Sequence, residues 1–252
     1  MLMNKHLKVI WFWVTAYSVA MGYLESAVVV YLREIYYPEG FSFPLKMMNQ
    51  HVAITEIFRE AATIVMLAAI AVLSGKSVTE KLAWFIFAFA IWDITYYLFL
   101  YLLLGWPPSL FTWDILFLIP VTWVGPVIAP IINSLTMIAL AIAIISYSRI
   151  NAGPVVKPVE WIILIAGSLM VMYGYMEDYL SYATKYLSLK ELLVSGMSER
   201  NVALMHAYEP GRFAWWWYAA GELLFVVSVL VIANRGRKRM RAVQTSDRKT
   251  GK

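Results

Sequence analysis

The sequence contains no cysteine and carries little charge. The absence of cysteine among 252 residues excludes disulfides, thiolate metal ligands and cysteine nucleophiles. Only 15% of the residues are charged, whereas a soluble domain carries about a quarter. The sequence also lacks a glycine-rich phosphate loop, a nucleophile elbow and a dinucleotide fingerprint. These absences leave few soluble enzyme classes to consider.

Hydrophobic residues make up 61% of the chain, and the mean hydropathy is +0.66. Apolar runs of about 20 residues predict spanning helices at 9–31, 52–74, 82–104, 130–148, 159–180 and 213–234. A seventh run, 109–128, is interrupted by Pro120 and Pro126, which remove backbone hydrogen bonds. We therefore expect an all-α, polytopic transmembrane helix bundle with six full spans plus one broken or re-entrant segment. Residues 1–241 form one domain in this prediction.

The distribution of lysine and arginine predicts the orientation of the chain. With six spans, fourteen basic residues lie on the side of the two termini and six on the opposite side. Basic residues in short loops favour the cytoplasm, so both termini are predicted to be cytoplasmic. Five of the seven residues from Arg235 to Arg241 are basic and follow a span directly. This cluster is typical of contact with anionic lipids and not of nucleic-acid binding. Residues 242–252 are expected to be a disordered cytoplasmic tail.

Acidic residues lie inside the expected spans, where charge is costly. The five carboxylates are Glu25, Glu56, Glu60, Asp93 and Glu222. Each ionised group near the bilayer centre costs roughly 2.5–3.5 kcal/mol, so these groups must be protonated, paired, hydrated or bound to a cation. All five fall in the middle-to-outer half of the membrane. We therefore expect a cavity that faces outward and binds a cation or protons.

Helical spacing gives several of these acids a partner. Positions 56, 59 and 60 share one helix face, so Arg59 can pair with one of the two glutamates. Tyr97 and Tyr218 each lie one turn from a buried acid, Asp93 and Glu222 respectively, and a phenol is a suitable hydrogen-bond partner. Structural pairing that only fixes helix packing is the alternative for each acid taken alone.

Three further acids are assigned to a second layer around the site. Glu177 and Asp178 lie near the outer end of the fifth span. Asp114 opens the broken stretch, where Thr112 is expected to cap a helix and to place Asp114 in its first turn. If that stretch dips inward, it lines or covers the acidic cavity.

Two histidines leave a metal site open as an alternative. His51 begins the second span, and His206 lies in the long outer loop 181–212. A carboxylate-rich site with one or two histidine ligands suits iron, manganese or zinc. No HExxH or histidine-rich motif accompanies them.

Four segments carry a resemblance to known sequences: LESAVVVYLREIYYPEGFSFPL (24–45), EIFREAATIVML (56–67), WDITYY (92–97) and LLGWPPSLFTWDILFLIPVTWVGPVIAP (103–130). They resemble a family of uncharacterised prokaryotic multi-pass membrane proteins with no known activity. The resemblance implies a prokaryotic cytoplasmic (inner) membrane and supplies no catalytic residues. Three functions stay open: cation or proton transport or relay, an accessory or scaffold subunit of a membrane complex, and a carboxylate-based membrane metalloenzyme.

Overall fold

Six long helices account for most of the chain and confirm the expected transmembrane bundle. The computed structural model describes residues 5–46, 48–118, 121–148, 154–194 and 199–249. Its elements are α1 (Lys5–Tyr36), α2 (Gln50–Ser74), α3 (Val78–Leu104), β1 (Trp113–Phe117), β2 (Trp123–Pro126), α4 (Ile128–Ser148), α5 (Pro158–Ala183), α6 (Leu189–Val194), α7 (Glu199–His206) and α8 (Trp215–Lys249). Helices α1 to α5 and α8 are long and apolar enough to cross a membrane.

Local sequence signals set the ends of these helices. Ser77 precedes α3, and its hydroxyl accepts a hydrogen bond from the Glu80 backbone N–H at 3.2 Å. Gly105 ends α3 in the left-handed conformation (φ 64°), and its N–H donates to the Tyr101 carbonyl at 2.9 Å. Pro158 occupies the first turn of α5, where its missing N–H costs nothing. The ends of α3 and α5 therefore follow from a few residues each.

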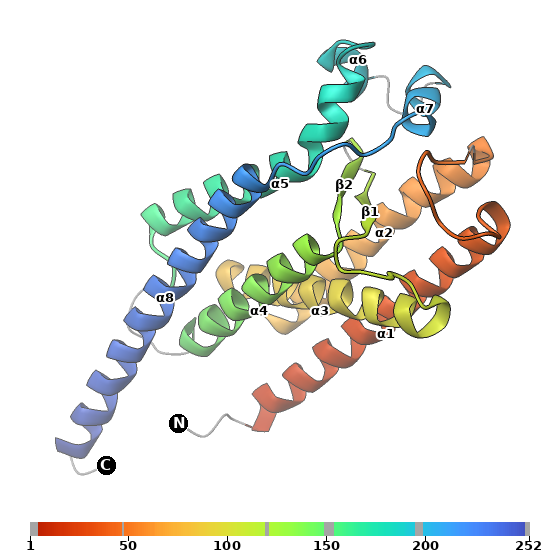
Figure 1. The fold of residues 1–252 in the computed structure, drawn as a ribbon. Helices are drawn as coiled ribbons and strands as arrows, with labels where there is room; N and C mark the ends of the chain where they lie inside the picture. Colours follow the sequence, from red (N-terminus) through yellow and green to blue (C-terminus); the bar gives the residue numbers. More distant parts are fainter. Residues whose placement is uncertain (1–4, 47, 119–120, 149–153, 195–198, 250–252) are drawn as a thin grey trace.

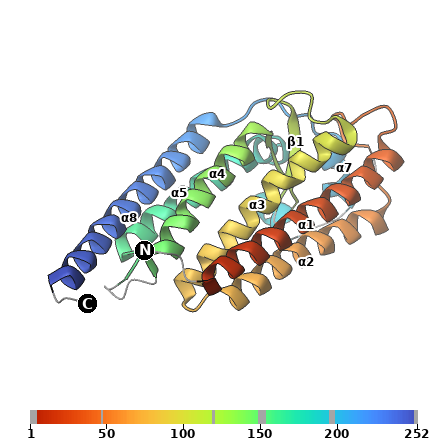
Figure 2. The same ribbon diagram turned by 90° about the horizontal axis from the view of Figure 1, so that it is seen from below.

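The spanning helices form two groups of three that meet along α3 and α4. Helix α3 packs against α1 and α2, while α8 packs against α4 and α5, as Figures 1 and 2 show. Glycines permit the closest approaches: a Cβ on Gly22 of α1 would lie 3.0 Å from the Trp92 carbonyl oxygen of α3. A Cβ on Gly221 of α8 would lie 2.7 Å from the Gly167 carbonyl oxygen of α5.

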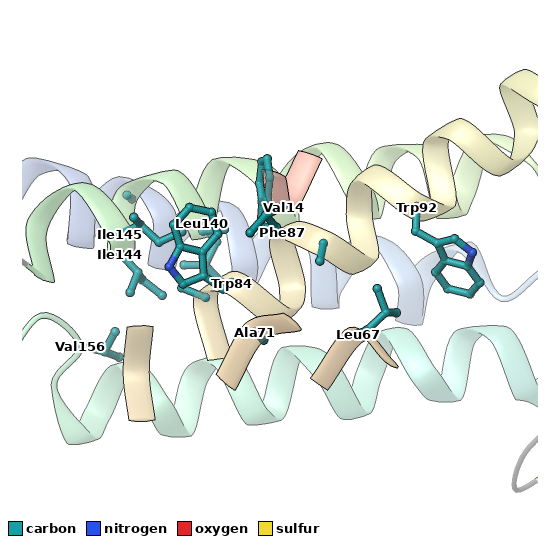
Figure 3. Packing of buried hydrophobic residues seen from close by; sticks show 14 of the residues in the cluster. Val14, Leu67, Ala71, Trp84, Phe87, Trp92, Leu140, Ile144, Ile145 and Val156 are labelled. Carbon is teal, nitrogen blue, oxygen red and sulfur yellow. The ribbon is translucent and has the colours of Figure 1, made fainter. Parts of the chain in front are cut away.

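The two ends of the bundle differ in their packing. The start of α1 and the end of α8 lie at one end, here called the terminal end (Figure 1). Near that end Trp84 of α3 is fully buried, in a core that also contains Leu67 and Ile144 (Figure 3). The opposite end, here called the loop end, carries residues 37–49, the β-hairpin, α6 and α7. The dense core therefore occupies the terminal half of the bundle.

The broken stretch forms an antiparallel β-hairpin and not the capped helix expected after Thr112. Strand β1 pairs with β2, with Asp114 opposite Gly125 and Ile115 opposite Val124. A helix is disfavoured here because prolines at 120 and 126 remove donors, while the aromatic and β-branched residues suit strands. The prediction of a broken segment is confirmed, but the expected position of Asp114 in a helical first turn is wrong.

The C-terminal segment differs from the expected disordered tail. Helix α8 continues to Lys249, so residues 242–249 are helical; residues 250–252 lie outside the described ranges. No proline occurs after Pro210, and no glycine lies between Gly236 and Gly251. Arginine, lysine, methionine, alanine and glutamine are strong helix formers, so the helix continues past the apolar span.

Candidate functional site

Acidic side chains from separate elements converge on one cavity in the loop half of the bundle. The cavity has a volume of about 170 Å³ and lies between α1, α2 and α3. Its lining also includes residues from the loop 37–49 and from β1. Five carboxylates and two guanidinium groups line it: Glu25, Glu56, Glu60, Asp93, Asp114, Arg33 and Arg59. The volume accommodates several water molecules or a hydrated small cation.

Helix geometry explains why three of these acids, Glu25, Glu60 and Asp93, share one depth. Glu25 lies eleven residues before the end of α1, and Asp93 lies eleven residues before the end of α3. At a rise of 1.5 Å per residue, each is about 16 Å from the loop end of its helix. Glu60 lies ten residues after the start of α2, at about 15 Å. The shared depth was expected from the sequence, and the rotation of each helix then turns these side chains towards one another.

Arg59 pairs with two of the carboxylates. Its Nε donates to Glu56 Oε2 at 2.7 Å, one turn away on α2, and its Nη1 donates to Glu25 of α1. The Thr63 hydroxyl continues the same face of α2 and donates to the Arg59 carbonyl oxygen at 3.0 Å. All three charged side chains are at least three-quarters buried. This triad carries one net negative charge when all its groups are ionised.

Arg33 forms a second charged group with Asp114. Its Nη2 lies 3.6 Å from Asp114 Oδ1, and its guanidinium lies 3.8 Å from the ring centroid of Trp106. The Tyr97 hydroxyl donates to Asp114 Oδ2 at 3.2 Å, and not to Asp93 as expected from their spacing. Burial raises the pKa of Asp114 to about 6, although Arg33 and the Tyr97 hydrogen bond oppose this rise.

Glu60 and Asp93 differ from the other three acids because their hydrogen bonds come from neutral groups. Glu60 accepts from the Leu118 backbone N–H at 3.1 Å, so β1 reaches across to α2. Asp93 accepts from the Ser134 hydroxyl of α4 at 2.8 Å. Neither carboxylate forms an ion pair within the described ranges. The cavity therefore contains two acids whose charge is not matched by a bonded cation.

Glu222 does not line this cavity. It lies on α8, and the protein buries all but 7% of its surface. Neither of its carboxylate oxygens accepts a well-formed hydrogen bond among the described residues: the Thr136 hydroxyl lies within reach but donates to the Ile132 carbonyl oxygen at 3.2 Å. Tyr218, its expected partner, donates instead to the Ala129 carbonyl oxygen at 2.7 Å. The expectation of a single cluster thus holds for four of the five predicted acids, and Glu222 occupies a separate position.

Glu177 and Asp178 support the loop end and are not in contact with the cavity acids. Asp178 accepts from the Tyr208 hydroxyl at 2.6 Å and from the Gly211 N–H at 2.8 Å. Glu177 pairs with Arg212 at 3.1 Å. Together they fix the connection between α7 and α8 against the end of α5.

The two histidines lie apart from the carboxylates. His51 is exposed at the start of α2. His206 is buried against the loop 37–49, with Nδ1 3.2 Å from the Leu45 carbonyl oxygen, and burial lowers its pKa. Within residues 5–46, 48–118, 121–148, 154–194 and 199–249, no group of three or more histidine, aspartate or glutamate side chains is arranged to hold a metal ion. The geometry therefore gives no support to His51 or His206 as metal ligands.

Three partners of the cavity acids were missed from the sequence. Arg33 is one of the six basic residues that the charge distribution assigns to the side opposite the termini, but Glu25, Val29 and Arg33 recur every four residues and share one face of α1. This spacing was the signal that identifies Arg33. Ser134 and the Leu118 N–H gave no such signal, because both reach the acids across tertiary contacts.

No protein-family profile, curated protein or solved structure matches this chain. The resemblance to prokaryotic multi-pass membrane proteins therefore stays a prediction.

Proposed function

We propose that the cavity binds a small cation, either a proton or a monovalent metal ion, and that the protein transports or relays it across part of the membrane. The observation that carries this proposal is the charge imbalance of the lining. Five carboxylates face two guanidinium groups, which leaves three negative charges when all are ionised. Glu60 and Asp93 are the groups that we expect to bind the cation, because their hydrogen bonds come only from neutral donors.

The cost of leaving these two acids ionised supports the proposal. One ionised carboxylate near the bilayer centre costs roughly 2.5–3.5 kcal/mol, so two cost roughly 5–7 kcal/mol. The net stability of a typical protein is only about 5–15 kcal/mol. A proton or a bound cation removes most of this cost. Oxygen ligands from carboxylates and hydroxyls also suit hard cations such as Na⁺.

The distribution of basic residues supports an orientation for this site. In the six-span prediction from the sequence, fourteen lysine and arginine residues fall on the side of the two termini and six on the opposite side. By the positive-inside rule, the terminal end then faces the cytoplasm and the cavity lies in the outer half of the membrane. The resemblance described above favours a prokaryotic cytoplasmic membrane. The basic continuation of α8 after Arg235 would contact anionic lipid headgroups on the cytoplasmic side.

The test is the thermal stability of the purified full-length protein in detergent as a function of cation concentration and pH. LiCl, NaCl and KCl are titrated against choline chloride, which controls for ionic strength. A cation at about 100 times its Kd stabilises the native state by about 2.7 kcal/mol, which raises the Tm by roughly 5–10 °C. If the proton is the cation, the salts act alike and the dependence appears in a pH series.

The double variant Glu60→Gln/Asp93→Asn is expected to lose the cation dependence and the part of the pH dependence that Glu60 and Asp93 contribute. The matched control Glu34→Gln/Glu191→Gln also removes two acids, but both are exposed and lie outside the cavity lining. The control should respond as the wild type does. A wild-type Tm with the same dependence on cations and pH as the double variant would refute the proposal.

A further inference from the structure

A second buried polar cluster lies between α4, α5 and α8, on the other side of α4 from the cavity. Of eight buried side-chain atoms without a hydrogen-bond partner in the described ranges, five belong to this region. They are Trp123 Nε1, Asn133 Oδ1, Tyr175 Oη and both carboxylate oxygens of Glu222. Buried polar atoms are normally hydrogen-bonded, so a concentration of unpartnered atoms indicates a ligand or water at that place.

The side chains of this cluster come from neighbouring helix faces. Asn133 and Thr136 lie one turn apart on α4, and the Thr136 hydroxyl lies beside Glu222. Tyr218, one turn before Glu222 on α8, lies beside the Asn133 backbone. The rings of Tyr175 and Tyr218 are 5.7 Å apart, which brings α5 to the same place. The side chains of the cluster therefore come from three helices, α4, α5 and α8, and not from one turn of a single helix.

The chemistry of these atoms favours a cation. Four of the five unpartnered atoms are oxygens: two from a carboxylate, one from an amide and one from a phenol. Carboxylate and amide oxygens accept hydrogen bonds and do not donate them, and Glu222 is 93% buried. The titratable groups facing Glu222 are Tyr175 and Tyr218, with Asp93 beyond them on α3. No lysine or arginine forms an ion pair with Glu222 within the part of the chain that the structure describes.

A hydrogen bond from α4 to the cavity acid Asp93 lies next to this second cluster in the chain. Ser134 of α4 donates to Asp93 at 2.8 Å, and it is adjacent in the chain to Asn133. Helix α4 thus presents Ser134 to Asp93 of α3 and Thr136 to Glu222 of α8. Asp93 also lies close enough to Tyr175 and Tyr218 to interact with them electrostatically. Asp93 on α3 and Glu222 on α8 thus both lie beside α4, and neither carboxylate forms an ion pair within the described ranges.

We propose that Glu222, with Asn133, Thr136 and Tyr175, forms a second site for a small monovalent cation, and that Ser134 connects this site to Asp93. The ligand is a proton or Na⁺. For a proton, Asp93 loses it and becomes a carboxylate while Glu222 gains it and becomes neutral, so the total charge is unchanged. This inference rests on the proposed function of the cavity and gives it a route from α3 to α8.

Infrared difference spectroscopy of the full-length protein in micelles tests the second site directly. A pH jump changes the C=O stretching band of each carboxyl group that gains or loses a proton. We expect one component of this band to be absent in Glu222→Gln and to shift in Tyr175→Phe. The control Glu177→Gln, which removes an acid at the loop end, should leave that component unchanged. If Na⁺ is the ligand, adding NaCl in place of choline chloride at constant pH abolishes the component in the wild type.

The failure of the second site can be distinguished from the failure of the cavity. A band that is unchanged in both Glu222→Gln and Tyr175→Phe overturns the second site, even if the Tm still depends on Glu60 and Asp93. If the infrared component of Glu222 is present but the cation dependence of the Tm is the same in the wild type and in Glu60→Gln/Asp93→Asn, the second site is supported and the proposed function is refuted. If Glu222→Gln does not fold, Tyr175→Phe carries the test: an unshifted band in that variant overturns the proposal.

Ser134→Ala tests the connection between the two sites. The variant is reconstituted in liposomes loaded with a pH-sensitive dye, and the rate of the pH change inside them is measured. We expect this rate to be about tenfold lower than in the wild type, because one hydrogen-bonded step is lost. Both carboxyl components should remain in its infrared spectrum. Thr95→Ala is the matched control, because the Thr95 hydroxyl donates only to backbone carbonyls of its own helix. Equal rates in Ser134→Ala and Thr95→Ala would overturn the connection.

Discussion

Replacing Arg59 by methionine should destabilise the protein more than any substitution of an exposed arginine. The guanidinium pairs with Glu25 and Glu56, and the side chains of the three residues are 22%, 13% and 10% exposed, respectively. Methionine fills similar space but leaves two buried carboxylates without a cation. Breaking a buried ion pair by removing one partner costs about 3–5 kcal/mol. We expect a loss in this range in the free energy of unfolding.

Equilibrium unfolding in mixed micelles measures this loss. Arg212→Met is the matched control, because Arg212 also pairs with a glutamate but its side chain is 76% exposed. Solvent reaches the Arg212 guanidinium and screens its pair with Glu177, whose side chain is 13% exposed, so this variant should lose clearly less stability than Arg59→Met. A loss for Arg59→Met that does not exceed the loss for Arg212→Met would refute the reasoning.

The triple variant Glu25→Gln/Glu56→Gln/Arg59→Met separates lost charge compensation from lost packing. Removing both partners of a buried pair is close to neutral, whereas removing one is costly. We therefore expect the triple variant to recover most of the stability that Arg59→Met loses. A triple variant as unstable as the single one would assign the effect to the shape of the side chain.

The remaining predictions concern packing and pH. Gly221→Ala should cost about 1–3 kcal/mol in the same unfolding assay, because the new Cβ would lie 2.7 Å from the Gly167 carbonyl oxygen; Gly211→Ala, whose Cβ would be 3.6 Å from its nearest neighbour, should cost less than 0.5 kcal/mol. Because burial raises the pKa of Asp114 from 3.8 to about 6, the native state binds this proton more tightly than the unfolded state does. The stability that neutral Asp114 contributes is therefore fully present below about pH 4 and is lost as the pH rises through 6. This loss amounts to roughly 3 kcal/mol in the free energy of unfolding, and Asp114→Asn should abolish it. Burial lowers the pKa of His206, so its contribution to stability falls as the pH drops below 6.5, opposite to that of Asp114. If the pH profile of stability is unchanged in Asp114→Asn, the loss of stability near pH 6 does not come from Asp114.

Much of the fold followed from residue types that act locally. Apolar runs placed all six spans, because each spanning helix satisfies its own backbone hydrogen bonds in lipid. The prolines at 120 and 126 identified the stretch that could not be a regular span. The hairpin itself was not expected, because a strand is stabilised by its partner strand and by contacts with other elements, such as the Leu118 N–H with Glu60.

The candidate site was predictable in depth but not in direction. Position along a helix fixes how far Glu25, Glu60 and Asp93 lie from the loop end. The residue pattern does not fix how each helix is rotated about its axis. Two hydrogen bonds inferred from i, i+4 spacing were wrong for that reason: Tyr97 donates to Asp114, and Tyr218 donates to Ala129. In both cases a tertiary acceptor took the place of the neighbour on the same helix.

The sequence by itself determined that this chain is a six-span membrane protein with costly acids in its spans, because hydrophobic length and buried charge are properties of single segments. It also determined that Arg59 shares a helix face with Glu56 and Glu60, and the tertiary structure then pairs it with Glu56 and with Glu25 of α1. Only the tertiary structure decided which acids meet. Helix packing turns Glu25, Glu56, Glu60 and Asp93 towards one cavity and leaves Glu222 on the far side of α4. The reason is physical: contacts between helices depend on small residues such as Gly22 and Gly221, whose effect on rotation appears only when the helices are packed.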